Sequence, residues 1–315
     1  MLNEQQSRYR FTIFIPTYNR AQLLPRALES VEQQTFHDFE VVIIDDGSTD
    51  NTAEIVKVWQ TRGDFPVLYH YQPNQGKPAA HNTGVEKAQG FFIVNLDSDD
   101  LLTPNALELL DQHWREIPDT DKPNFAGVEG LCAMLSDHSI AGDRFPEDIF
   151  DSNYLELRLK LHISGDKKNA IRTDVLREFP FPLFPGEKHI RQSVIWNRIA
   201  RKYQFRYINE IIQYIEYQPD GLSAGAFWRR IHSPKSYRLT YQELVNDYAE
   251  YYSAAQNFKT MAKYVRFSLH CGVPLSRQRS EIKDKRLWLM ALPKGWLSYL
   301  NDRRKIKAAP HKAGL

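Results

Sequence analysis

The first half of the chain alternates short continuous runs of apolar, β-branched residues with segments whose apolar residues recur every three or four positions. Continuous apolar runs are typical of strands buried on both faces, and the recurring spacing is typical of helices that cover a sheet. The expected strands are residues 11–15, 41–44, 67–71 and 91–94, and a helix is expected after each of them. This alternation predicts an α/β fold with a mostly parallel sheet flanked by helices.

The second half is less regular. We expect a strand at 125–135, a loop at 136–150, a helix at 190–202 and a pair of strands within 205–217. From Ala226 onward the apolar spacing is helical. We therefore predict two parts: residues 1–225 as an α/β domain, and residues 226–315 as a basic, aromatic-rich helical C-terminal region.

Composition narrows the class of protein. Hydrophobic residues make up 42% and charged residues 25% of the chain, which is ordinary for a globular domain and excludes a disordered chain or a collagen. Two cysteines, Cys132 and Cys271, are too few for a disulfide framework or a four-ligand zinc site. The polar first ten residues predict no secretory signal, and no apolar run reaches the length of a membrane span. We expect a cytoplasmic protein.

The charge is unevenly distributed. Residues 226–315 hold 18 Lys or Arg and 6 Asp or Glu, a net of +12, so the remainder carries −10. Within this basic part, residues 286–300 are apolar and contain two Trp, and the basic run 302–307 follows. This pattern predicts peripheral contact with an anionic membrane. A helical pair that packs on the catalytic domain or in a homodimer is the alternative. No motif that reads nucleic acid accompanies the charge, so we expect no nucleic-acid partner.

Polar segments follow the expected strands. An aromatic side chain such as Tyr18 suits contact with a flat base, and Asp45 and Asp46 suit hydrogen bonds from a nucleobase or ribose. Asp97 and Asp99 should point to the same side of an extended segment, and paired carboxylates suit Mg²⁺ or Mn²⁺. Each segment has a plainer alternative: a turn, a capped loop or a solvated acidic loop.

The segment 74–84 joins a polar loop to a helix of small residues. Lys77 and the helix amides are suited to a phosphate, whereas His81 is open to either a phosphate contact or a structural role. The chain has no G-x-G-x-x-G, no P-loop, no G-x-S-x-G and no H-E-x-x-H motif, which excludes the usual nucleotide folds and hydrolase sites that carry them.

Taken together, the segments 15–20, 45–50, 74–84 and 95–100 resemble the N-terminal half of glycosyltransferase family 2, whose members are inverting enzymes with the GT-A fold. The resemblance covers residues 10–118 and, more weakly, 165–225. It implies a GT-A, Rossmann-like mixed sheet with a C-terminal helical extension, and a nucleotide-sugar-binding, catalytic role for residues 1–225. It also implies a nucleoside-diphosphate-sugar donor, usually a UDP-sugar, and a divalent cation, Mn²⁺ or Mg²⁺.

The resemblance assigns roles to particular residues. Tyr18 would contact the base, Asp46 would bind the base or ribose, and Asp97 and Asp99 match the D-x-D motif. Asp99 is then the first metal ligand and Asp97 the second, with Asp100 as a helper. The expected donor-binding residues are Pro16, Thr17, Tyr18, Asp46, Lys77, Asn82, Asp97 and Ser98.

The catalytic base departs from the family pattern. In the family, an acidic residue four positions before a tryptophan on a helix deprotonates the acceptor hydroxyl. Counting back from Trp196 gives Gln192, which cannot act as a base. Glu187, the nearest carboxylate, is our substitute candidate, and His189 is a further one. Residues 217–223 resemble the family loop that lies near the donor diphosphate and acceptor, although a plain surface loop is an equal alternative.

We therefore predict an inverting glycosyltransferase that moves a sugar to a hydroxyl of a glycan or lipid-linked acceptor. Bacterial surface polysaccharide synthesis at the inner face of the membrane is the expected setting. The alternative is a partner subunit that binds nucleotide-sugar but lacks the usual base, because Gln192 stands in its place. A nucleotidyltransferase would need a glycine-rich first loop, which residues 16–19 do not provide.

Overall fold

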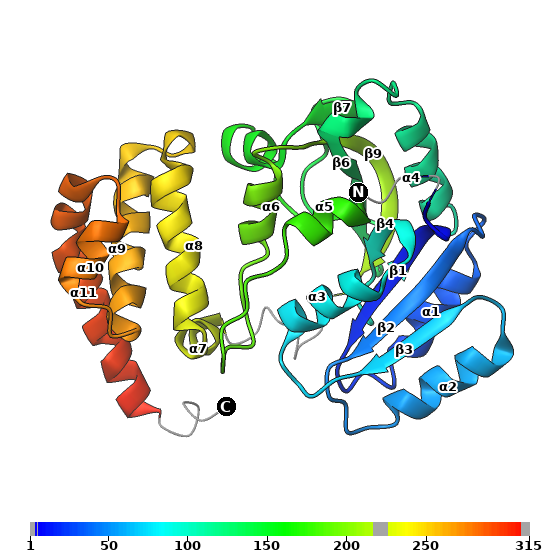
Figure 1. Cartoon of the computed structure of the whole chain (residues 1–315), viewed down its shortest axis with the longest axis horizontal. Coiled ribbons are helices and arrows are strands. Elements are labelled where there is room, and N and C mark those ends of the chain that lie inside the picture. The colour runs from blue at the N-terminus through cyan, green and yellow to red at the C-terminus, as the bar shows by residue number, and fades with distance from the viewer. Residues whose placement is uncertain (1–3, 5, 217–225, 310–315) are drawn as a thin grey trace. The chain divides into compact units, whose positions relative to one another are not determined.

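A computed structural model describes residue 4 and residues 6–216 and 226–309. The chain divides into two compact units (Figure 1). The first comprises Met1–Phe181 and Ile195–Tyr217, and the second comprises Pro182–Val194 and Gln218–Leu315. The segment 182–194 therefore belongs with the C-terminal helices, whereas the predicted division placed it in the first part, residues 1–225.

The first unit is built on one mixed sheet of nine strands, in the order β3-β2-β1-β4-β8-β6-β9-β5, with β7 paired to β9. The strands are β1 (Tyr9–Thr17), β2 (Phe39–Asp45), β3 (Val67–Tyr71), β4 (Gly90–Asn95), β5 (Leu101–Leu102), β6 (Phe125–Met134), β7 (Ile149–Ser152), β8 (Lys167–Arg172) and β9 (Gln204–Ile215). β1 to β4 pair only in parallel with one another, whereas β8 is antiparallel to both β4 and β6. The predicted mixed α/β sheet is confirmed.

Helices cover both faces of this sheet, as Figure 1 shows. In the first unit the helical elements are α1 (Leu24–Glu32), α2 (Thr52–Arg62), α3 (Lys77–Lys87), α4 (Ala106–Arg115), α5 (Thr173–Glu178), α6 (Ser193–Ile199), the 3-10 turn Lys122–Asn124 and the π-turn Glu156–Lys160. The apolar residues of α1, α2 and α4 pack on one face of β1, around Phe11 and Ile13. Those of α3 and α5 pack on the opposite face, around Phe14. Continuous apolar strands are explained by this double coverage.

The second unit is helical. It contains α7 (Ala226–His232), α8 (Pro234–Asp247), the 3-10 turn Ala249–Tyr251, α9 (Ala254–His270), α10 (Leu275–Glu281) and α11 (Lys285–Ala308). α9 begins with a capping box in which Ser253 and Gln256 bond reciprocally. In the described part of the chain, no helix is long and apolar enough to cross a bilayer.

The structure corrects three local expectations. The pair of strands predicted within 205–217 is one strand, β9, which runs alongside β6 and tolerates register shifts there. The helix predicted at 190–202 is shortened to Ser193–Ile199. The loop predicted at 136–150 ends in a short strand, β7, on the sheet edge. In each case, pairing with a distant strand or packing outweighs the local pattern.

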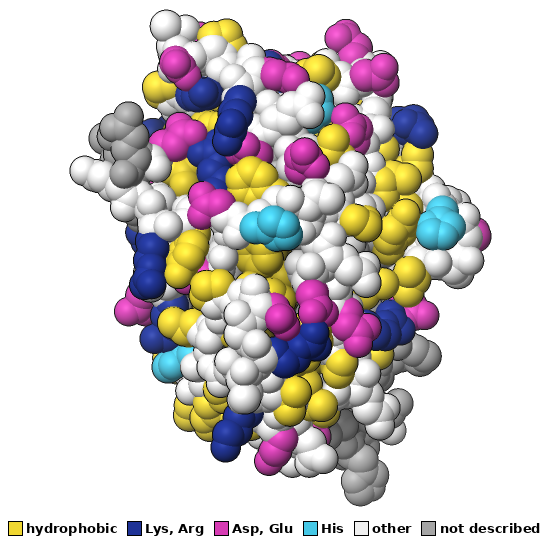
Figure 2. All heavy atoms as spheres, turned by 90° about the vertical axis from the view of Figure 1, so that its right-hand side faces the viewer, with side chains coloured by type: hydrophobic (Ala, Val, Ile, Leu, Met, Phe, Trp, Pro, Cys, Tyr) yellow, Lys and Arg dark blue, Asp and Glu magenta, His cyan; other side chains and the backbone are white. Residues whose placement is uncertain are grey.

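Charge is mixed on the face of the molecule that Figure 2 presents. Acidic and basic side chains alternate there with apolar ones, and no patch of a single sign dominates the view. The distribution of charge on this face therefore does not indicate where a ligand would bind.

Candidate active site at the strand ends

Parallel pairing brings the polar segments after β1, β2 and β4 to one edge of the sheet. Thr17 is in register with Asp45, and Phe14 is in register with Asn95. β1 and β2 therefore end level, β4 ends three residues before the end of β1, and all three loops leave from the same edge of the sheet. This edge holds the strand ends and loops that carry Pro16, Thr17, Asp46 and Asp97, whose donor-binding roles stay predictions.

Side chains join the first two loops. Asn19 adopts a left-handed backbone conformation, with φ of 51°, and its Oδ1 accepts a hydrogen bond from the Thr49 amide at 2.8 Å. In return, Ser48 Oγ accepts from the Asn19 amide at 2.8 Å, and Asp50 accepts from the Ala21 amide at 3.0 Å. Sequence reasoning missed these contacts. The signal was present in the Asn and Asp residues, which favour left-handed and capped turns.

Asp46 organises the next loop. It is buried, and its Oδ1 accepts from the side chain of Gln72 at 2.8 Å and from the Gln75 amide at 2.9 Å. Its Oδ2 accepts from the Gly76 amide at 2.7 Å. The carboxylate therefore holds the loop that leads into α3 before any ligand binds. Its predicted contact with a base or ribose is not tested by these bonds and stays a prediction.

Lys77 and Asp97 form an ion pair. Lys77 is the first residue of α3, and its ammonium donates to both Asp97 oxygens at 2.7 Å. Burial alone would raise the pKa of Asp97, but Lys77 and Lys168 outweigh it and hold that pKa at about 2. Burial likewise opposes the rise in the pKa of Lys77, which Asp97 produces. Both side chains stay about 30% exposed, so solvent screens part of this attraction.

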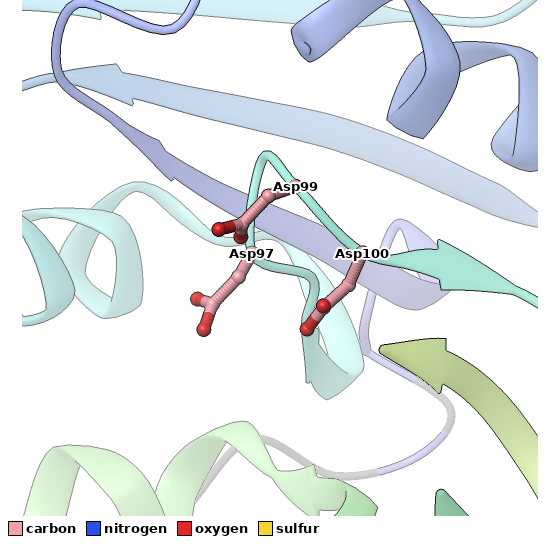
Figure 3. Close-up of side chains that lie close together, drawn as sticks. All are labelled: Asp97, Asp99 and Asp100. Carbon is pink, nitrogen blue, oxygen red and sulfur yellow. The ribbon is translucent and has the colours of Figure 1, made fainter. Parts of the chain in front are cut away.

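Asp99 and Asp100 lack such an ammonium partner. Figure 3 shows the three aspartates around one short turn, and one carboxylate oxygen from each lies within 4.8 Å of the others. Burial and the charge of Asp97 raise the pKa of Asp99. The same two causes raise the pKa of Asp100 to about 7, even though Gln213 donates to Asp100 at 2.6 Å. The three carboxylates of this turn therefore repel one another, and Lys77 neutralises only one of them.

The chemistry of these donors fits a divalent cation. Hard carboxylate oxygens that converge in this way suit Mg²⁺ or Mn²⁺. Asp99 has no side-chain partner within the described residues, and Gln213 bonds only one oxygen of Asp100. Asp97, in contrast, already gives both oxygens to Lys77. Asp99 is thus the carboxylate with the fewest contacts of the three, and Asp100 is at least as available as Asp97. The predicted roles of Asp99 and Asp97 as metal ligands stay predictions.

The other predicted donor-binding residues at this edge differ in exposure. Tyr18 follows β1 and is 48% exposed, which leaves its ring open to a ligand. Pro16 and Thr17 are the last residues of β1. The Thr17 hydroxyl is buried and has no hydrogen-bond partner among the residues described, which is a costly state that a bound polar group would relieve. Ser98 is buried within the turn of the aspartates.

Asn82 and His81 both contact the segment that ends the first part of this unit. Asn82 exchanges two hydrogen bonds with the backbone of Phe181, at 2.8 and 2.9 Å. The His81 ring packs edge-on against Phe14 and Phe181, and burial together with Lys77 lowers its pKa to about 4. In this structure both side chains therefore have structural contacts. The donor-binding role of Asn82 stays a prediction.

Glu187 lies in the second unit, at the start of α8. Its Oε1 accepts from the Lys235 amide at 2.8 Å, and its Oε2 accepts from the amide and hydroxyl of Ser236 at 2.8 and 2.7 Å. A carboxylate in this position satisfies helix N–H groups and complements the helix dipole. Any role as a base is additional to this capping function and stays a prediction.

The remaining base candidates are nearby in sequence. Gln192 is exposed in the turn that precedes α6. His189 stacks on Tyr237 with ring centroids 5.9 Å apart, and burial, Arg229 and Arg191 lower its pKa to about 4. The predicted loop 217–223 lies outside the described residues.

Comparison with known proteins identifies related sequences. The model of the family described as glycosyl transferase family 2 matches residues 12–178. A Campylobacter jejuni protein named GalNAc(5)-diNAcBac-PP-undecaprenol beta-1,3-glucosyltransferase is 26% identical over 285 residues, which cover 83% of this chain and 86% of that protein. An uncharacterized glycosyltransferase of Rickettsia bellii is 40% identical over 100 residues, but the match spans only 14% of its length and 32% of this chain.

A solved structure supports the fold. The S. aureus TarS fragment 1–349, determined in complex with UDP-GlcNAc, aligns with 96% of this chain and 92% of its own, with a TM-score of 0.61. The sequences are 18% identical, so this likeness bears on the fold alone. It agrees with the GT-A architecture expected from the sequence.

The raised pKa of Asp100 predicts a pH-dependent gain in stability for Asp100→Asn. The folded state binds the Asp100 proton more tightly than the unfolded chain does. In the wild type, the stability contributed by protonated Asp100 is therefore fully present below about pH 4 and is lost as pH rises through about 7. In EDTA at pH 8, we expect Asp100→Asn to unfold at a higher temperature than the wild type. The expected gain in the free energy of unfolding is on the order of 2 kcal/mol. At pH 5 the gain should be much smaller.

Thermal unfolding at both pH values measures this difference. Asp119→Asn, which changes an exposed carboxylate, is the control and should show no pH-dependent gain. An equal effect of Asp100→Asn at pH 5 and pH 8 would contradict the proposed repulsion.

Proposed function

The chain belongs to glycosyltransferase family 2, and we propose that it is an inverting enzyme that transfers a sugar from a UDP-sugar to a hydroxyl of a glycan or lipid-linked acceptor. That the chain is a glycosyltransferase follows from the family. The observation that carries the finer proposal is the turn of three aspartates that follows β4, with Lys77 bonded to one of them. Tyr18, whose ring is exposed, follows the neighbouring strand β1. Such an edge combines a face for a base with ligands for a diphosphate-bound cation.

We assign donor binding to the strand-end loops. Tyr18 would stack on the base, and Asp46 would bind the base or ribose through the lone pairs that its three loop contacts leave free. Pro16, Thr17 and Ser98 would line the same edge, and Lys77 would move from Asp97 toward a donor phosphate. This last step is supported by the partial exposure of the ion pair, since a fully buried pair would be much harder to open.

Asp99, with Asp97, would hold Mn²⁺ or Mg²⁺. When bound, such an ion supplies positive charge to the nucleoside diphosphate that leaves. The raised pKa of Asp99 supports the assignment, because a carboxylate that resists ionisation beside its neighbours gains most from a cation. If Lys77 turns to a phosphate, Asp97 becomes free to act as the second ligand.

The reaction needs a base for the acceptor. In a single inverting displacement, the acceptor oxygen forms a bond to the anomeric carbon, the bond to the diphosphate breaks, and a base takes the hydroxyl proton. We propose Glu187 for this role. Its present hydrogen bonds with α8 occupy both carboxylate oxygens, so the acceptor hydroxyl would have to compete with them.

A second candidate function is a partner subunit that binds nucleotide-sugar without transferring it efficiently. The engagement of Glu187 as a helix cap, together with Gln192 at the family position of the base, favours it. The two functions are distinguished by whether any carboxylate of the second unit limits turnover.

For the acceptor, we propose a polyprenyl-diphosphate-linked glycan of a bacterial surface polysaccharide. The support is the Campylobacter relative, whose name describes a diphosphate-linked undecaprenol substrate and whose length this chain largely covers. Such an acceptor lies in a membrane, so the enzyme would work at the inner face of that membrane.

The helix α11 offers a surface for this peripheral contact. Leu289, Met290, Trp296, Leu297 and Leu300 are exposed on it, from 37% to 65%. Seven basic residues lie on the same helix: Lys285, Arg286, Lys294, Arg303, Arg304, Lys305 and Lys307. Apolar residues that enter the headgroup region, flanked by cations that attract anionic lipid, together produce membrane binding. A homodimer across the apolar face is the alternative.

The donor site predicts a loss of metal-dependent binding in Asp99→Asn. We expect the wild-type chain to bind and slowly hydrolyse one UDP-sugar from a panel of nucleotide-sugars when Mn²⁺ is present. Asp99→Asn should weaken the metal-dependent binding by at least about tenfold because it removes a cation ligand. Calorimetry and detection of released UDP measure the two effects.

The matched control for that experiment is Asp119→Asn, whose carboxylate is exposed and bonds only Lys122. It should bind and hydrolyse the donor as the wild type does. If the wild-type chain bound none of the nucleotide-sugars, the donor site would be refuted.

The assignment of the base predicts that Glu187→Gln lowers kcat by about 100-fold or more while the Kd of the donor stays unchanged. Ser236→Ala is the matched control, because it removes one partner of the cap and leaves the carboxylate in place. Steady-state kinetics and thermal unfolding are compared for both variants.

Equal losses of activity in Glu187→Gln and Ser236→Ala, in proportion to lost stability, would show that Glu187 only caps α8. A gain of activity in Gln192→Glu from an inactive wild type would favour the second candidate function.

The membrane surface predicts that Trp296→Ser with Leu297→Ser weakens binding to vesicles that contain phosphatidylglycerol by at least about tenfold, since each buried apolar side chain contributes about 1.5–3 kcal/mol. Binding should also fall with salt. Co-sedimentation measures both effects, and Leu275→Ser, which changes an exposed leucine on α10, is the control. Unchanged vesicle binding combined with a shift from dimer to monomer in light scattering would refute the membrane role.

A further inference from the structure

Four cations in the helical unit act electrostatically on one another, since Lys263 feels the charges of Arg191, Arg230 and Lys259. Arg191 lies in the segment before α6, Arg230 lies on α7, and Lys259 and Lys263 lie one turn apart on α9. No hydrogen bond or ion pair to any of these four side chains is present within residues 6–216 and 226–309. The strongest charge interactions of Lys263 are all with cations: Arg191, Arg230, Arg266 and Lys259.

The described neighbours of Lys263 include an aromatic ring, which belongs to a stack of aromatic side chains on α8 and α9. The Lys263 ammonium lies 5.4 Å from the centre of the Tyr241 ring. Tyr237 stacks on Phe267 at 5.3 Å and on His189 at 5.9 Å. A ring face attracts a cation but does not neutralise its charge.

The fifth cation of the group is already neutralised. Arg266 donates to both oxygens of Asp302 at 2.5 Å, and His270 also contacts that carboxylate at 2.9 Å. Asp302 is buried in this contact, so it is committed to holding α9 and α11 together. The charge of the other four cations remains uncompensated.

This arrangement is unfavourable in the free protein. The Nε of Arg230 is buried and has no hydrogen-bond acceptor within the described part of the chain, which costs the desolvation of a donor. Partial burial and the neighbouring cations lower the pKa of Lys263, the direction expected of repulsion. An anion with several oxygens would relieve both costs at once, because guanidinium and ammonium groups bind phosphate oxygens in charge-assisted hydrogen bonds.

We propose that Arg191, Arg230 and Lys263, extended by Lys259, form a binding site for a phosphate or diphosphate group. The site lies in the helical unit and shares no residue with the donor-binding loops. Two sources could supply the group: the diphosphate of a lipid-linked acceptor or the headgroup phosphate of an anionic lipid. The first source rests on the proposed function, whereas the site itself does not.

Inorganic pyrophosphate is the first probe. Calorimetry in EDTA, with the full chain, should show saturable binding that weakens at least tenfold in Lys263→Gln and in Arg230→Gln. Lys57→Gln, which neutralises an exposed lysine on α2, should bind as the wild type does. Absence of binding by the wild type, or equal binding by the double variant Arg230→Gln with Lys263→Gln, would overturn the proposal.

Asp99→Asn separates this site from the donor site. Pyrophosphate should bind Asp99→Asn in EDTA as tightly as it binds the wild type, because the cation site is not involved. If donor binding fails in every variant but this binding survives, the proposed function is wrong and the phosphate site stands. If pyrophosphate binding is lost in Asp99→Asn, the phosphate site is wrong.

Stability gives a second, independent readout. Because the four cations repel one another, Lys263→Gln should unfold at a higher temperature than the wild type when no anion is present. Pyrophosphate should raise the melting temperature of the wild type and have little effect on the double variant. A less stable Lys263→Gln that responds to pyrophosphate as the wild type does would overturn the proposal.

Vesicles then identify the source of the phosphate. Phosphatidylcholine vesicles with and without phosphatidylglycerol are compared for the wild type and the double variant. A loss of phosphatidylglycerol binding in the double variant supports a headgroup phosphate. Unchanged vesicle binding, with pyrophosphate binding lost, supports the diphosphate of a soluble or lipid-linked acceptor.

Discussion

Electrostatic repulsion among the three aspartates after β4 is the constraint on which the rest of the first unit depends. Lys77 neutralises Asp97, but Asp99 and Asp100 remain crowded beside it. Placing this turn at the end of a parallel strand costs stability in the free chain, a cost that a bound cation would reduce. The position of Lys77 at the first turn of α3 means that a single side chain can serve either the aspartates or an anionic ligand.

The surrounding loops are organised before any ligand binds. Asp46 holds the loop that leads to α3, and Asn19 and Asp50 join the loops after β1 and β2. Because these bonds are internal, the entropy of ordering the loops is lost on folding and would not reduce the affinity for a ligand bound at this edge. The buried hydroxyl of Thr17 is the exception, and it lacks a partner at the same edge.

In the second unit, the two faces of α11 differ in their contacts. Asp302 holds α11 against α9 through Arg266 and His270, and Gly295 allows the close approach, since a Cβ there would lie 2.6 Å from the Val265 side chain. One face of α11 is thereby buried and the opposite apolar face is left exposed. The cations of this unit outnumber its acids, so a region of uncompensated positive charge remains beside α9.

The sequence predicted β1 to β4 and β6, the helices that follow the first four strands, the acidic segment after β4 and the family, because these depend on residue periodicity and on short motifs. It did not predict β5, β7 or β8, which have short or weak apolar patterns of their own. It did not predict that β9 is one strand, nor that Gln213 on β9 and Lys168 on β8 act on the aspartates, because strand order brings them there from more than 70 residues away.

Glu187 shows the same division. Its carboxylate type was visible in the sequence, but its partners at Lys235 and Ser236 depend on where α8 begins and packs. The cations Arg191, Arg230 and Lys263 are likewise unremarkable in the sequence and are brought together only by helix packing. Local chemistry is encoded by neighbouring residues, whereas burial, charge pairing and pKa depend on distant residues that only the folded chain brings into contact.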